Sequence, residues 1–423
     1  MKGTGVRSVV RNSGFLIGST TLTTLLRGVY VIVLARLLGP DAYGTLNYGI
    51  SWYLTFIALT YLGLDVVLGR EVGRGHNMVP SLVGSTFVLR AGVAVVVCVL
   101  STIIAIVAES NSVARELLVI FSIALIGRAI WLWCMSVFSA FEDTRHVFFI
   151  EFFFRPLEIV AVVFVLLLLP HKSIFAVGVI HAALWWFQGT IGVFTVLRYV
   201  TPMDLSANWS QAKQLLVAGV PGGLYTLAFS WFMQAPIVLY RQTFGTGEDL
   251  GYFSLSIQVI GYLVIIPYLA GSAALPVLSR SAARGDGKDR TVALAMLTLI
   301  PTIGVVLAAV GMWLAPLLTE LIFGVNFGYA GIILSEAIWL LIPFSLVIGL
   351  QQIAFARGSH VVVSLPGILG AVVMTGLFVP LAQALSYRGA LLATGLGMTV
   401  WAGGVVIALI RRGFFKLGKP NSR

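Results

Sequence analysis

Residues 34–75 read LARLLGPDAYGTLNYGISWYLTFIALTYLGLDVVLGREVGRG, and this stretch decides the fold. A long apolar helix is expected to end at Leu34-x-Arg36, and Gly39-Pro40 predicts a tight turn after it. Asp41 then stands where it would cap a second helix. This second helix continues through apolar residues and leaves through the motif Leu68-x-Arg70-x-x-x-Arg74-Gly75. The stretch therefore predicts two long apolar helices joined by a short turn.

The landmarks of this stretch return in the same order about two hundred residues later. The offset is 205 residues at the first landmark, 207 at the second and 210 at the third, so two short insertions account for the difference. The second copies are Leu239-x-Arg241, Glu248-x-x-Gly251 and Leu278-x-Arg280-x-x-x-Arg284-Gly285. Two related halves are typical of a transporter with a site between them.

The composition is that of a membrane protein. The chain has 423 residues, of which 59% are hydrophobic and 10% charged, and its mean hydropathy is +0.99. Apolar runs of at least about eighteen residues, long enough to cross a bilayer, recur along the whole length. A transmembrane barrel would alternate polar and apolar residues, whereas these runs are continuously apolar. The chain is therefore expected to be a polytopic, all-α integral membrane protein.

The hydropathy pattern predicts twelve transmembrane helices in two six-helix lobes. The expected domains are residues 1–200 and 201–423. Because each lobe has an even number of spans, both lobes share one orientation, and a pseudo-two-fold axis along the membrane normal is expected. The predicted spans are 13–38, 43–69, 80–108, 113–138, 147–169, 174–198, 212–239, 249–279, 290–315, 328–355, 359–382 and 387–410.

The distribution of Lys and Arg predicts the orientation. With both termini in the cytoplasm, 18 of the 27 Lys and Arg residues fall in cytoplasmic segments and 5 in outer ones. This excess is a strong positive-inside signal and indicates a multi-pass protein of the cytoplasmic membrane. The net charge of +11 then reports topology, and no nucleic-acid partner is expected.

The remaining four arginines lie inside predicted spans of the first half. An arginine at a helix centre costs about 2.5–3.5 kcal/mol on insertion scales, so none of the four should face lipid. Acidic residues of the same half are available as partners. The arginines are Arg27, Arg90, Arg128 and Arg155, and the acidic residues are Asp65, Glu151 and Glu158.

The span 147–169 is the densest in charge. Glu151, Arg155 and Glu158 are spaced four and three apart, which places them on one helix face. One interpretation is an ion-pair network that holds helices together. The other is a cationic cavity that neutralises an anionic substrate head, a role that suits the planar, permanently charged fork of arginine. Both hold if a phosphate shares arginines with resting carboxylate partners.

Further polar residues inside the spans are candidate sugar contacts or ordinary interhelical hydrogen-bonding groups. Glu336 is expected to be the one deeply buried carboxylate of the second half, either as a proton or cation site or as the partner of an arginine across a cleft. Asp65, Glu151 and Glu158 are the other candidates for ion coupling. The candidate sugar contacts are His181, Trp185, Gln188, Tyr225, Gln234 and Gln258.

Sequence signals for covalent chemistry are weak. No GxxxxGK[ST] phosphate loop occurs, and no loop is long enough for a soluble catalytic domain. Glu142-Asp143, in a cytoplasmic connection, is the nearest approach to a glycosyltransferase carboxylate pair. Cys98 and Cys134 fall in apolar runs and are expected to be small core residues. No enzyme activity, cofactor or metal is therefore expected.

The opening stretch, LARLLGPDAYGTLNYGI followed by LGLDVVLGREVGRG, resembles the start of polysaccharide biosynthesis proteins. These are oligosaccharide flippases of the multidrug/oligosaccharidyl-lipid/polysaccharide exporter superfamily. The resemblance is best over residues 13–75, and the span count and repeat extend it over the chain. Multidrug antiporters of the superfamily also have twelve spans, so cation-coupled drug efflux is the alternative function. Lipid II flippases, with fourteen spans, fit less well.

The resemblance implies a V-shaped bundle of two six-helix lobes that works by alternating access. It also implies a central cationic cavity for an isoprenoid-linked saccharide, with Arg27, Arg128 and Arg155 as its residues here. The expected partners are then a lipid-linked oligosaccharide, membrane lipids and other membrane proteins of glycan assembly.

Overall fold

The computed structural model describes residues 6–73, 79–169, 173–205, 209–284 and 288–412. Within these ranges every regular element is a helix. The chain forms two compact units, Met1–Thr226 and Leu227–Arg423, so their boundary falls within helix α8 (Trp209–Phe244). The first part of α8 belongs to unit 1 because Gly219 and Gly223 press against the backbone of residues 62–63. The expected division of the repeat at residue 200 stays a prediction.

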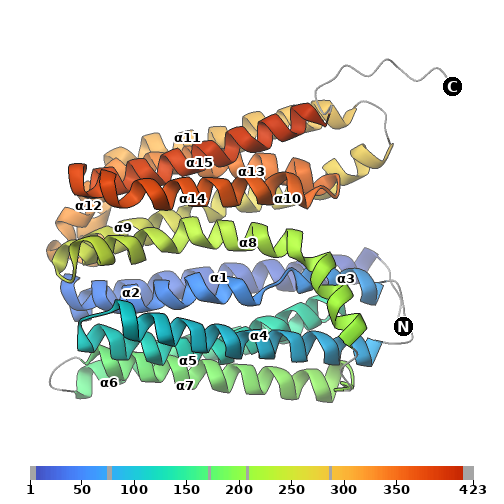
Figure 1. Cartoon of the computed structure of the whole chain (residues 1–423), viewed down its shortest axis with the longest axis horizontal. Coiled ribbons are helices and arrows are strands. Elements are labelled where there is room, and N and C mark those ends of the chain that lie inside the picture. Colours follow the sequence, from blue (N-terminus) through green and yellow to red (C-terminus); the bar gives the residue numbers. More distant parts are fainter. Residues whose placement is uncertain (1–5, 74–78, 170–172, 206–208, 285–287, 413–423) are drawn as a thin grey trace. The chain divides into compact units, whose positions relative to one another are not determined.

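Unit 1 is built from the helices drawn in blue to green in Figure 1. Its long helices run nearly parallel or antiparallel, with α5 packed against both α4 and α7 and α1 packed against α6. The elements are α1 (Val6–Leu38), α2 (Pro40–Ile57), the 3₁₀ turn η1 (Ala58–Thr60), α3 (Leu64–Gly73), α4 (Val79–Ala108), α5 (Ser112–Ala140), α6 (Arg145–Leu168), α7 (Ile174–Thr195) and the π-helical turn η2 (Val196–Val200).

Unit 2 begins within α8 and contains the helices drawn in yellow to red. Its last two helices form an antiparallel pair joined by a single residue, Ser386. The elements after α8 are α9 (Glu248–Leu263), α10 (Ile265–Arg284), α11 (Lys288–Phe323), η3 (Val325–Phe327), α12 (Gly328–Ala337), η4 (Ile338–Leu340), α13 (Leu341–Ala356), α14 (His360–Leu385) and α15 (Tyr387–Arg411).

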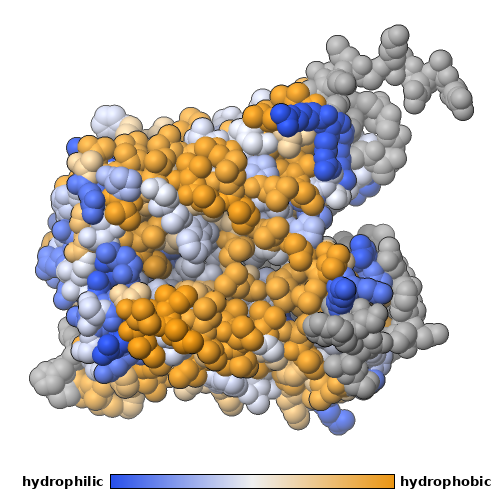
Figure 2. Space-filling model, viewed as in Figure 1, coloured by the Kyte–Doolittle hydropathy of each residue, from blue (hydrophilic) through white to orange (hydrophobic). Residues whose placement is uncertain are grey.

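The structure confirms the all-α membrane fold. Ten helical stretches of the described chain are long and apolar enough to cross a membrane. The other two predicted spans correspond to α2–η1–α3, which is interrupted at residues 58–63, and to α6, which carries several charges. Figure 2 shows apolar residues covering the sides of the helices, with hydrophilic ones gathered near helix ends. This surface is what a lipid environment requires.

The turn at Gly39 differs from expectation in one detail. Gly39 itself is the N-cap of α2, with φ of 76°, and Asp41 lies in the first turn without capping it. A carboxylate there still interacts favourably with the helix dipole. The second copy is built alike, because Gly247, with φ of 140°, precedes α9 and its Glu248. In the third landmark, Arg74, Gly75 and Gly285 lie outside the described residues.

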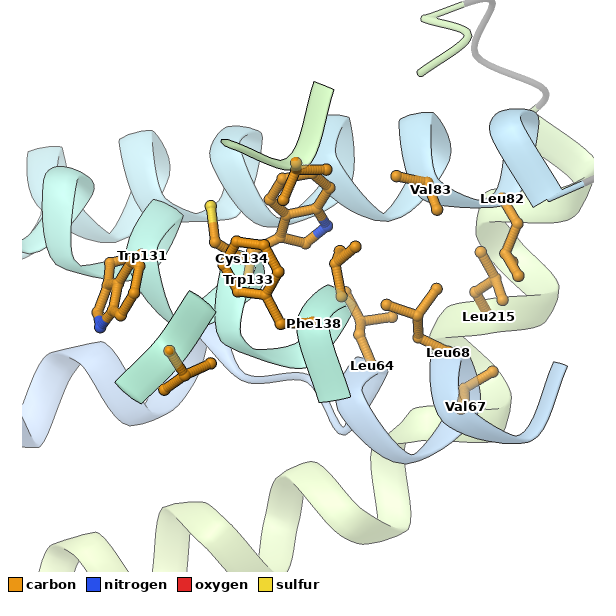
Figure 3. Packing of buried hydrophobic residues seen from close by; sticks show 13 residues of the cluster. Leu64, Val67, Leu68, Leu82, Val83, Trp131, Trp133, Cys134, Phe138 and Leu215 are labelled. Carbon is orange, nitrogen blue, oxygen red and sulfur yellow. The ribbon is translucent and has the colours of Figure 1, made fainter. Parts of the chain in front are cut away.

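A core of large apolar residues ties α3 to α4, α5 and the start of α8 in unit 1 (Figure 3). Trp133 and Phe138 of α5 lie at its centre, and the Trp133 indole donates to the Thr86 hydroxyl at 3.1 Å. Cys134 is buried in the same core as a free thiol, as expected, and Cys98 is a half-buried free thiol. This packing fixes the inner face of α5, on which the polar site is built.

Candidate substrate-binding site

The charged residues of α6 form a continuous ion-pair chain. The Arg155 Nε donates to Glu151 Oε2 at 2.8 Å, and its Nη1 donates to Glu158 Oε2 at 2.7 Å. All three side chains are buried, which confirms the predicted shared face. The opposite face of α6 exposes phenylalanines such as Phe149 and Phe153. Since that face is the apolar one, the charged face must point into the helix bundle.

The polar face of α7 is bonded to the same carboxylates. The Trp185 indole donates to Glu158 Oε1 at 3.2 Å, and the Gln188 amide donates to Glu151 Oε1 at 3.3 Å. His181 Nδ1 lies 2.7 Å from Glu158 Oε1. These three residues were candidate sugar contacts. In the structure they complete the coordination of the carboxylates, and a direct sugar contact stays a prediction.

Two further residues of this site were not predicted from the sequence. The Tyr30 hydroxyl of α1 lies 2.5 Å from His181 Nε2, and the Trp131 indole of α5 donates to Glu151 Oε1 at 2.9 Å. Trp131 is three residues after Arg128 on α5, a spacing that indicates a shared face. We call the whole set the buried ion-pair cluster: Tyr30, Arg128, Trp131, Glu151, Arg155, Glu158, His181, Trp185 and Gln188.

Small residues let α5 and α7 approach closely enough to build the cluster. A Cβ on Gly127 would lie 2.7 Å from the Trp186 backbone, and one on Gly189 would lie 2.7 Å from the Gly127 carbonyl oxygen. Close approach at small residues is typical of helix pairs in membranes. Arg128 follows Gly127 and Gln188 precedes Gly189, so the close approach brings these two side chains together. Arg128 Nη1 donates to Gln188 Oε1 at 3.2 Å.

Arg128 is less tightly paired than Arg155. The nearest carboxylate oxygen to its Nη1, Glu151 Oε1, lies 3.9 Å away. Arg27 is half-buried on α1 and has no acidic partner at ion-pair distance among the described residues. It lies close enough to Arg128 and Glu151 to interact with both electrostatically. Three arginines thus face two carboxylates. The site carries an excess of positive charge, and that excess belongs to Arg128 and Arg27.

Arg90 and Asp65 form a separate pair. Arg90 Nη1 donates to Asp65 Oδ1 at 2.8 Å, Ser136 donates to the same oxygen at 2.6 Å, and the guanidinium lies 4.7 Å from the Tyr61 ring centroid. Arg90 is one of the four arginines considered for the cationic cavity, and that role stays a prediction. Its observed contacts tie α4 to α3 and to the break between α2 and α3, and Asp65 in turn bonds to Ser136 of α5.

Glu336 does not match the expectation of a deeply buried carboxylate. Its side chain is 32% exposed and forms a bidentate pair with Arg388, at 2.6 and 2.7 Å. Arg388 lies in the same unit, because the first turn of α15 packs beside α12 at the helix ends. The other candidates, Tyr225 and Gln234 on α8 and Gln258 on α9, are half-buried.

The carboxylates elsewhere do not gather into a metal site in the described ranges. No group of three or more His, Cys, Asp or Glu residues there is placed to hold a metal ion. Asp143 of the Glu142-Asp143 pair is engaged by Arg145 at 2.6 Å and by His146 at 3.4 Å. Both Asp143 oxygens therefore already face cationic or donor groups.

We predict that Arg155→Ala destabilises the protein far more than Arg128→Ala. Removing Arg155 strands two buried carboxylates, a change that typically costs about 3–5 kcal/mol. Removing Arg128 breaks one hydrogen bond between a charged donor and a neutral amide, typically about 1.5–3 kcal/mol, and strands no carboxylate of its own. Thermal unfolding in detergent, followed by tryptophan fluorescence, measures the difference. Adding Glu158→Gln to Arg155→Ala should restore part of the loss. Equal destabilisation by the two alanine variants would contradict the prediction that Arg155 contributes more to stability than Arg128.

Comparisons with known proteins agree with this architecture. Residues 9–282 match the family described as Polysaccharide biosynthesis protein. A search of curated proteins finds no match. Among solved structures, the inward-facing conformation of a multidrug resistance MATE family transporter of the MOP superfamily is similar over 94% of this chain and 96% of its own, with a TM-score of 0.74 and 18% identity.

Two further structures show the same fold. The outward-facing conformation of a multidrug resistance MATE family transporter gives a TM-score of 0.63 at 17% identity and covers 99% of this chain and 100% of its own. A MOP superfamily transporter from Pyrococcus furiosus gives 0.59 at 18% identity and covers 97% and 96%. At these identities the likeness establishes the fold alone. Because the family match spans well over half of the chain, the protein belongs to the polysaccharide biosynthesis family and has the fold of MATE transporters of the MOP superfamily.

Proposed function

We propose that the protein is a flippase that moves an isoprenoid-pyrophosphate-linked oligosaccharide across the cytoplasmic membrane by alternating access, for assembly of a cell-surface polysaccharide. The family match and the transporter fold support a role in transport. The observation that carries the substrate class is the excess positive charge of the buried ion-pair cluster with Arg27. That charge lies within helices that a bilayer surrounds.

A pyrophosphate head needs such a site. An anion transferred into a medium of low dielectric constant loses hydration worth many kcal/mol, so the transporter must supply replacement donors. Arginine presents several N–H donors in a fixed fork, remains charged, and bonds phosphate oxygens two at a time. The isoprenoid tail is apolar and remains in lipid.

The cluster divides its arginines between two tasks. Arg155 is held by two carboxylates of its own helix within 2.8 Å, and the same carboxylates bond to Trp185 and Gln188 of α7, so Arg155 serves as part of the scaffold. Arg128 donates to the neutral Gln188 amide, and exchanging that acceptor for a phosphate oxygen strands no charge. Arg128 and Arg27 are thus the arginines that bind the pyrophosphate.

The sign of the charge also separates this function from the alternative within the same fold. A cation-coupled antiporter that exports cationic drugs needs a site with excess negative charge. Here the surplus is positive, since two carboxylates face three arginines and lie bonded to Arg155 or to indole and amide donors. The site therefore favours an anionic substrate. We infer no covalent step, because Asp143 of the best carboxylate pair is bound by Arg145.

We propose that both termini lie in the cytoplasm. The connections between α1 and α2, between α4 and α5 and between α8 and α9 then face outward. The asymmetry of Lys and Arg supports this orientation. Single cysteines placed at Ser112 and at Arg411, tested with a membrane-impermeant maleimide in intact cells, check it. Only the cysteine at residue 112 should react. Labelling at residue 411 and protection at residue 112 would invert the topology.

We predict that Arg128→Lys lowers polysaccharide export by at least about tenfold while the protein still inserts. Lysine keeps the charge but loses the bidentate fork, and one lost pair of charge-assisted hydrogen bonds is worth about 1.5–3 kcal/mol. Export is measured by complementation of a flippase-null strain, with the amount of membrane protein quantified in parallel. Arg198→Lys, at an exposed position near the end of α7, is the matched control and should export normally.

Full export by Arg128→Lys would refute phosphate recognition at this residue. Failure of the wild-type chain to complement, together with drug efflux in the same cells, would refute the flippase function and support the antiporter.

A further inference from the structure

Three tyrosines meet at one end of unit 2, outside the buried ion-pair cluster. Tyr252 of α9 and Tyr329 of α12 have ring centroids 5.5 Å apart at 71°, and Tyr329 and Tyr387 of α15 have centroids 6.4 Å apart at 86°. Tyr329 and Tyr387 lie in the first turn of their helices and Tyr252 is the fifth residue of α9, and these helices begin at the same end of the unit (Figure 1). Edge-to-face rings from three helices thus form one aromatic surface, which we call the tyrosine platform.

Charged groups surround the platform on its accessible side. The Tyr252 hydroxyl donates to Glu248 at 2.8 Å, and Asp249 is the next residue of α9. The Arg388 guanidinium forms the bidentate pair with Glu336 and lies 5.8 Å from the Tyr387 ring centroid. Tyr329 is 44% exposed and the Arg388 side chain 64% exposed. Accessible rings and planar polar groups therefore lie beside one another at this end of the unit.

The backbone holds part of this surface in a fixed position. Ser386, the single residue between α14 and α15, has φ of 56° and ψ of −141°, a sparsely populated conformation that costs a non-glycine residue about 1–3 kcal/mol. Gly389 packs so closely that a Cβ there would lie 1.8 Å from the Leu381 carbonyl oxygen. Such a strained turn persists only where its surroundings fix it. Tyr387 and Arg388 follow directly, so their placement is preorganised.

We propose that the tyrosine platform, with Glu248, Asp249, Glu336 and Arg388, binds a neutral pyranose ring of an oligosaccharide. The choice of a saccharide rests on the proposed flippase function. A pyranose presents an apolar C–H face, which an electron-rich ring face attracts, and a rim of hydroxyls. Carboxylates accept from those hydroxyls, and the arginine fork donates to their oxygens. Three carboxylates against one arginine among the exposed groups disfavour an acidic sugar.

The arrangement differs from ordinary interfacial anchoring. Single tyrosines and tryptophans often lie at the membrane surface as anchors. Trp313 of α11, which is 82% exposed, fits that description. The platform tyrosines instead contact one another and acidic side chains. Trp313 is therefore the matched control that separates a binding role from anchoring.

The test is saccharide binding by the full-length protein in lipid nanodiscs, measured by saturation-transfer NMR. The probes are the neutral trisaccharides maltotriose, cellotriose and chitotriose, and the acidic trigalacturonate. We expect at least one neutral probe to bind and trigalacturonate to bind at least about fivefold more weakly. Tyr329→Ala and Tyr387→Ala should each weaken neutral binding by about five- to tenfold. Tyr329→Phe keeps the ring and should bind normally, as should Trp313→Ala.

Absence of binding by all three neutral probes would overturn the inference. So would unchanged binding in both alanine variants, or equal loss in Trp313→Ala, which would make the tyrosines anchors only. Tyr329→Phe guards against misfolding, because it retains the packing of the ring. The two proposals fail separately. Arg128-dependent export without probe binding refutes the platform alone, whereas probe binding without complementation refutes the flippase function alone.

Discussion

The ion pairs of Arg155 with Glu151 and Glu158 are the interaction on which unit 1 depends. A membrane helix with three charged residues is stable only if their charges compensate one another and their remaining hydrogen-bonding groups find partners. Helix α6 meets the first condition only in part, because its Arg155 faces two carboxylates, and Arg128 and Arg27 supply the remaining positive charge. Helices α5 and α7 supply partners to the carboxylates with Trp131, Trp185 and Gln188, and Tyr30 of α1 bonds to His181, which lies against Glu158. The need to satisfy two buried carboxylates thus determines which faces of four helices meet.

The same geometry leaves one arginine without a carboxylate of its own. Gly127 and Gly189 bring α5 against α7, so Arg128 reaches Gln188 before it reaches Glu151. Its guanidinium is oriented by a neutral acceptor, which an anionic ligand displaces without leaving an unpaired charge. Arg27 adds a second guanidinium within electrostatic range. The scaffold and the binding function are therefore separate parts of one cluster, and a substitution is expected to affect them differently.

The sequence predicted those features that the bilayer imposes directly. A span must be continuously apolar, so the helices and their order follow from hydropathy, and the shared face of Glu151, Arg155 and Glu158 follows from helical periodicity. The breaks at residues 58–63 and near 264 and 338–340 did not follow, because they depend on packing between distant segments.

The sequence also did not show which polar side chains pair with one another. His181, Trp185 and Gln188 share a face for which the sequence left two roles open, sugar contact and interhelical hydrogen bonding. The approach of α7 to α6 shows that all three contact the carboxylates. Glu336 was expected to be buried because its neighbours are apolar. A single-residue turn at Ser386 places Arg388 beside it, and the pair lies at the helix ends where both side chains are partly exposed.

The most direct test of the central claim is the affinity of the purified protein for a short isoprenoid pyrophosphate. Isothermal titration in nanodiscs with farnesyl pyrophosphate, with farnesol as the apolar control, measures it for the wild type, Arg128→Lys and Arg198→Lys. We expect that the pyrophosphate binds, that farnesol does not compete at equal concentration, and that Arg128→Lys alone weakens binding by about tenfold. Equal affinity in all three proteins would contradict it, because the spare guanidinium of the buried cluster would then have no part in holding the anion.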